Sequence, residues 1–147
     1  MVEFRLNEVL AGWEIVSISG TDHITYEIVD DGEVVESRYD FLGVFLRLYE
    51  CAYKELETEN HPSGGRKYDI EKVGDDTIRL SVRRSDTEVV TTFDELEDTL
   101  GTFLREVFDQ LNQKPNADSE RAEALRSFRR GNIEKPEFYY NRITDGE

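Results

Sequence analysis

Hydrophobic and polar residues alternate in two short stretches of the chain, and a long helical pattern follows each of them. Ile24, Tyr26 and Ile28 fall on one face of an extended strand, and the apolar residues of 78–82 repeat that alternation. A period of two is typical of a half-buried β-strand. Both stretches are therefore predicted to be strands with one face toward a core.

Turn residues and further β-rich runs complete two groups of three strands. Asp30-Asp31-Gly32 predicts a tight hairpin turn, because Asp-Gly accepts the positive φ angles that such a turn needs. Ahead of the first group, Phe4, Val9 and Leu10 fit one side of a short amphipathic helix. The predicted strands are residues 13–19, 23–29 and 33–37, then 67–73, 77–83 and 88–92.

Two amphipathic helices are predicted, over residues 40–57 and 93–112, from apolar residues at helical spacing. Each begins near a capping-box pattern, Ser37-x-x-Asp40 in the first and Thr92-x-x-Glu95 in the second. Their apolar stripes supply the expected core residues, which are Phe41, Phe45, Leu48, Leu100, Phe103, Leu104 and Val107.

The order of elements predicts a single α+β domain over residues 1–147, built from two similar β-β-β-α halves, 13–57 and 67–112. About six antiparallel strands are expected to form one sheet with the two repeat helices on one face. A split into two small sheets is the alternative. Residues 113–147 are expected to add a helix over about 118–130, which carries an arginine cluster, and an aromatic tail without a clear period.

The net charge of −15 is concentrated in the repeated body of the chain. Residues 1–112 hold 11 Lys and Arg against 26 Asp and Glu, whereas residues 113–147 hold 7 of each. Such a field repels nucleic acid and anionic membranes and attracts a cationic protein. The candidate residues for binding that partner are Glu95, Asp98, Glu106, Asp109, Asp30 and Asp31.

Residues that would carry catalysis or hold a metal are not grouped in the sequence. His23 and His61 are far apart, and the single cysteine, Cys51, lies on the apolar face of the first helix. We therefore expect no catalytic residue, no metal and no cofactor. The lone cysteine and a beginning without the pattern of a secretory signal favour the cytoplasm.

Three functions are compatible with these features. The first is a non-enzymatic acidic protein-binding module, such as an immunity protein or an inhibitor of a cationic protein. The second is a chaperone-like or housekeeping domain with a surface adapted to high salt, which the 5 Lys against 13 Arg favour. The third is an enzyme that uses carboxylates in a cleft. The element order resembles small acidic secretion-chaperone domains in layout alone, and a homodimer is compatible with all three.

Overall fold

The structure is a computed structural model, and it describes residues 1–10, 23–57, 67–112, 125, 128–129 and 133–145. The first half comprises β1 (Val2–Leu10), β2 (His23–Asp30), β3 (Glu33–Asp40) and α1 (Leu42–Lys54). The second comprises β4 (Tyr68–Lys72), β5 (Thr77–Val82), β6 (Glu88–Thr92) and α2 (Phe93–Asn112), and α4 (Pro136–Thr144) follows. The β-β-β-α order therefore occurs twice, and the α+β prediction is confirmed.

The six strands form two three-stranded antiparallel sheets, in the orders β1-β2-β3 and β4-β5-β6. The predicted split into two small sheets is thus the arrangement found, and the described strands do not join into one six-stranded sheet. The predicted hairpin turn between β2 and β3 is confirmed, since Asp31 and Gly32 have φ angles of 51° and 84°. Those left-handed angles match the twist of the two strands that the turn connects.

The helix predicted around Phe4 and Val9 is wrong, because these residues belong to β1, an edge strand of the first sheet. Val2, Phe4 and Leu6 alternate as strand residues should, but the register shifts between Leu6 and Glu8. This irregularity changes the phase, so that Val9 is buried like Phe4 although five positions separate them. The strand predicted at 13–19 lies outside the described residues.

The two repeat helices begin in different ways. The predicted capping box Ser37-x-x-Asp40 is wrong, because β3 continues to Asp40 and α1 begins at Leu42 without a side-chain hydrogen bond at its N-cap. The box before α2 is found in part. The backbone N–H of Glu95 donates to the hydroxyl oxygen of Thr92 over 3.0 Å, while the Glu95 carboxylate accepts from Thr91 instead.

Five elements meet in one aromatic cluster at the centre of the core. Its members are Phe4 on β1, Tyr26 on β2, Phe45 on α1, Tyr68 on β4 and Phe103 on α2, all nearly inaccessible to solvent. The rings of Phe45 and Phe103 lie 4.7 Å apart, and so do those of Tyr26 and Phe45. Both halves therefore share a single core. Of the seven core residues expected from the sequence, six are buried; Phe41 is half-buried beside the start of α1.

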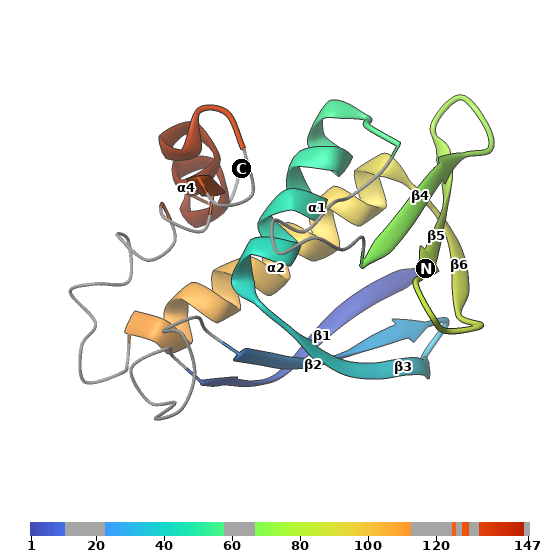
Figure 1. Ribbon diagram of the computed structural model, residues 1–147, viewed down its shortest axis with the longest axis horizontal. Coiled ribbons are helices and arrows are strands. Elements are labelled where there is room, and N and C mark those ends of the chain that lie inside the picture. Colours follow the sequence, from blue (N-terminus) through green and yellow to red (C-terminus); the bar gives the residue numbers. More distant parts are fainter. Residues whose placement is uncertain (11–22, 58–66, 113–124, 126–127, 130–132, 146–147) are drawn as a thin grey trace.

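Figure 1 shows the layers of this fold: the first sheet lies beneath α1 and α2, the second sheet stands at one end of them, and α4 packs at the other. α4 was not predicted. Its Tyr139 and Ile143 are buried, and Tyr139 packs edge-on against Tyr49 of α1. The helix predicted at 118–130 lies mostly outside the described residues; within it, Leu125 and Phe128 are buried.

Candidate functional site

A groove of about 460 Å³ runs between the edge strand β1 and the outer side of α2. Acidic side chains outnumber basic ones along it, with five carboxylates against the guanidinium group of Arg5 and the ammonium group of Met1. Val2, Phe4 and Val29 also border it but are at most 4% exposed, whereas Leu6 is partly exposed. The groove is therefore bordered mainly by acidic side chains.

The helical wall of the groove is one stripe of α2. Glu95, Asp98, Thr102 and Glu106 follow each other at intervals of three or four residues, so their side chains share one side of the helix. The opposite side carries Leu100, Phe103, Leu104 and Val107 into the core. The amphipathic pattern that makes α2 fold onto the sheet thus also fixes the direction of these acids.

The other wall is β1, which α2 holds through a hydrogen bond. The backbone N–H of Phe4 points away from β2 and donates to the hydroxyl oxygen of Thr99 over 2.9 Å. An exposed strand edge is open to pairing with another chain, and a covering helix is one way to close it. Thr99 closes this edge at Phe4 and sets the separation of strand and helix there.

Three acids of the groove already have partners, and one of them, Glu3, lies 3.8 Å from the guanidinium group of Arg5. Asp31 accepts a hydrogen bond of 2.6 Å from the N-terminal ammonium group. This bond, followed by the charge of the ammonium, lowers the pKa of Asp31, and the same bond raises the pKa of the ammonium. The carboxylate of Glu95 accepts a hydrogen bond of 2.7 Å from Thr91. Glu3, Asp31 and Glu95 are thus each paired within the protein.

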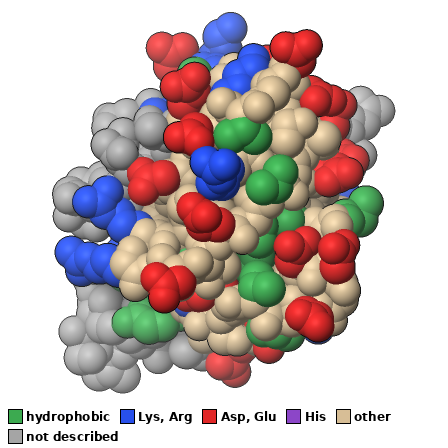
Figure 2. Space-filling view, turned by 90° about the vertical axis from the view of Figure 1, so that its right-hand side faces the viewer, with side chains coloured by type: hydrophobic (Ala, Val, Ile, Leu, Met, Phe, Trp, Pro, Cys, Tyr) green, Lys and Arg blue, Asp and Glu red, His purple; other side chains and the backbone are tan. Residues whose placement is uncertain are grey.

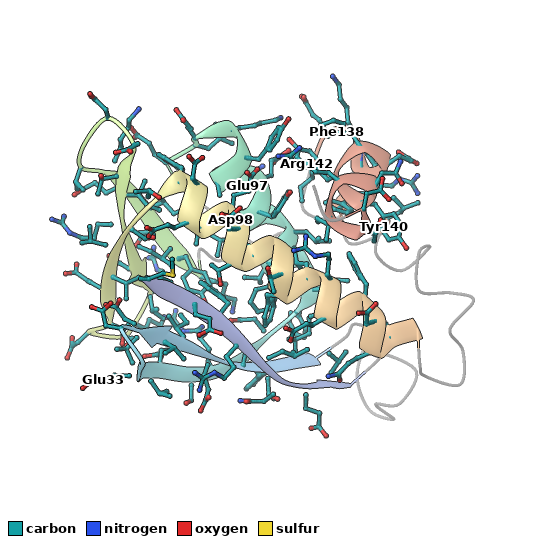
Figure 3. All side chains as sticks on the ribbon, turned by 180° about the vertical axis from the view of Figure 1, so that it is seen from behind. Glu33, Glu97, Asp98, Phe138, Tyr140 and Arg142 are labelled. Atoms are coloured by element: carbon teal, nitrogen blue, oxygen red, sulfur yellow. The ribbon has the colours of Figure 1, made fainter. Side chains whose placement is uncertain are left out.

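Asp98 and Glu106 are different, because both are exposed and neither has a hydrogen-bond or ion-pair partner among the described residues. Figure 3 shows the molecule from behind, with Asp98 on α2 above β1, whereas the neighbouring Glu97 lies toward α4 and Arg142. Two acids that are adjacent in the sequence of α2 therefore face different parts of the molecule. Asp98 and Glu106 are thus the exposed carboxylates of the groove without such a partner.

The structure brings together four of the six acids that the sequence marks as candidates. Glu95, Asp98, Glu106 and Asp31 line the groove. Asp109 does not line it, being beyond Glu106 on α2, and Asp30 does not line it either, although it lies 3.7 Å from the Met1 ammonium group. The opposite wall, β1, was missed. Figure 2 shows how widely acidic side chains are spread on the face at the β4–β6 end of the molecule.

A second hollow of about 450 Å³ lies where β3 meets α1, beside a buried polar cluster. Asp40 is 4% exposed and accepts hydrogen bonds from the hydroxyl of Tyr26 at 2.6 Å and from Nε of Arg38 at 3.0 Å. The hydroxyls of Tyr26 and Tyr68 are also hydrogen-bonded. Burial raises the pKa of Tyr26 well above its usual value, and Tyr68 and Asp40 raise it further.

This cluster connects the two sheets, because Tyr26 belongs to β2 and Tyr68 to β4. The sequence did not predict this cluster, because Asp40 was assigned to a helix cap and the tyrosines were assigned to the alternating pattern of strands. The hydrogen bonds that Arg38 and Tyr26 donate to Oδ2 of Asp40 offset the cost of burying this polar group. We therefore read the cluster as a structural connection between the two halves.

A third group of charges holds α4 against the repeat helices. Nη2 of Arg142 lies 3.6 Å from the Glu97 carboxylate, and its guanidinium group lies 4.7 Å from the centre of the Tyr53 ring. Burial raises the pKa of Glu97, and this effect outweighs the attraction of Arg142, which acts in the opposite direction. Glu97 is thus a carboxyl group with a raised pKa, but it lies outside the groove.

Groups that commonly carry chemistry are not assembled in the part of the chain that the structure describes. Cys51 is buried in α1. Among the described residues, no three His, Cys, Asp or Glu side chains are grouped to hold a metal ion. His61 lies outside those residues. Likewise, none of the described helices is long and apolar enough to cross a membrane.

Comparisons with models of protein families, with curated proteins and with solved structures find no significant match to this chain. The groove between β1 and α2 is therefore the feature from which we infer a function.

Proposed function

We propose that the chain is a non-enzymatic protein-binding module, and that its groove between β1 and α2 binds a cationic segment of another protein. The observation that carries this proposal is the pair Asp98 and Glu106: two exposed carboxylates on one side of the groove, without partners among the described residues. An immunity protein or an inhibitor that neutralises a cationic protein is the kind of protein that this geometry suits.

Electrostatics supports the proposal in two ways. The whole chain carries a net charge of −15, which raises the rate at which a cationic partner arrives. At close range, the acids of the groove select a positive side chain, and the partly exposed Leu6 offers apolar contact. Aliphatic stems of lysine and arginine cover apolar surface while their charged ends reach outward.

The reading as a carboxylate enzyme has less support. Acid–base catalysis with carboxylates generally needs one of them to have a pKa raised by its surroundings. Among the described residues, Glu97 is the carboxyl group whose pKa is raised, and it is bound to Arg142 between α2 and α4. The carboxyl group with the raised pKa, Glu97, thus lies away from the open groove.

The test is binding of a fluorescently labelled lysine-rich peptide, compared between the wild type and two double variants. Asp98→Asn with Glu106→Gln removes the two unpartnered charges of the groove. Glu57→Gln with Asp145→Asn removes the same charges from exposed positions outside it. We expect the groove variant to weaken binding about tenfold and the control less than twofold, because local ion pairs act over short range at about 0.15 M salt.

Salt dependence and folding complete this experiment. Binding by the wild type should weaken steeply between about 50 mM and 500 mM NaCl, since salt screens exposed charges. Circular dichroism should show both double variants folded as the wild type is. Equal loss of binding in the two variants would mean that overall charge, and not the groove, attracts the peptide. Absence of binding by the wild type at low salt would contradict the proposed function.

A further inference from the structure

We draw no further inference here: the strongest candidate, the hollow of about 450 Å³ where Arg38 and Lys67 lie at the N-terminus of α1, carries nothing, because Arg38 is already paired with Glu36 and Asp40 and no second feature of the described residues points to an anion that would bind there.

Discussion

The backbone N–H of Phe4 donates a hydrogen bond to the side chain of Thr99, 95 residues later in the chain. It connects the edge strand of the first half to the helix that ends the second half. The groove exists because strand and helix are held together here, with the aromatic ring of Phe4 turned inward against Phe45 and Phe103. The bond is therefore a direct target for mutation.

Thr99→Val should lower the free energy of unfolding by about 1 kcal/mol, because it removes the acceptor of a partly buried N–H group while keeping a branched side chain. Thr102→Val, at an exposed position of the same stripe, should change it by less than about 0.5 kcal/mol. Urea unfolding measures both. Hydrogen exchange at the Phe4 amide should accelerate in the first variant alone, and equal exchange in both would show that the bond contributes nothing.

Tyr26→Phe should lower the free energy of unfolding by about 1–3 kcal/mol, since the variant loses a hydroxyl that is bonded to Asp40 and Tyr68 in the core. Asp40 would retain the bond from Arg38 but would have one acceptor less satisfied. Tyr53→Phe is the matched control, because it makes the same chemical change at a partly exposed ring. Comparable stability of the two variants in urea would argue against a connecting role for the cluster.

Alkaline pH should unfold the protein through its buried tyrosines. Burial raises the pKa of Tyr26, Tyr49 and Tyr139, so the folded state keeps these protons at a pH where the unfolded state loses them. Their contribution is complete below about pH 10 and is lost as the pH rises above it. Absorbance of tyrosinate at alkaline pH, followed together with circular dichroism, should show these three ionising with unfolding. Their ionisation in a fully folded protein would contradict this.

Arg142→Ala should loosen α4 and lower the free energy of unfolding by about 1 kcal/mol, because the guanidinium group stacks on Tyr53 and pairs with Glu97. Glu97→Gln should cost less, since burial already disfavours its charged form, as its raised pKa indicates. Proteolysis near α4, measured for both variants, compares the two effects. Greater sensitivity of Glu97→Gln would reverse the assignment of which side chain holds the helix.

The sequence predicted the second half best because its signals are local. β6 and α2 have the predicted bounds, and in α2 the apolar stripe is long enough to determine the type of element. β1 was missed because its irregularity between Leu6 and Glu8 breaks the alternation on which the prediction depends. α4 is short, and buried aromatic contacts such as that of Tyr139 with Tyr49 stabilise it.

The acids of the site were predictable one by one, but the groove was not. Asp98 and Glu106 follow from the outer stripe of a helix that the sequence already marks. Their opposite wall comes from the first residues of the chain, and no local pattern connects Phe4 with Thr99. Periodicity identifies the exposed side of an element, whereas only the packing of distant elements shows which exposed sides face each other.

The covering of β1 by α2 also matters while the chain is being synthesised. β1 is synthesised before β2 and β3, which can pair with it as soon as they follow. Its outer edge stays open until α2 has been made, some ninety residues later. An uncovered edge strand is a template for pairing with other chains, so nascent or truncated chains that end before α2 are those most prone to aggregate. Synthesis of α2 is thus the step after which the outer edge of β1 can be covered and protected from pairing with other chains.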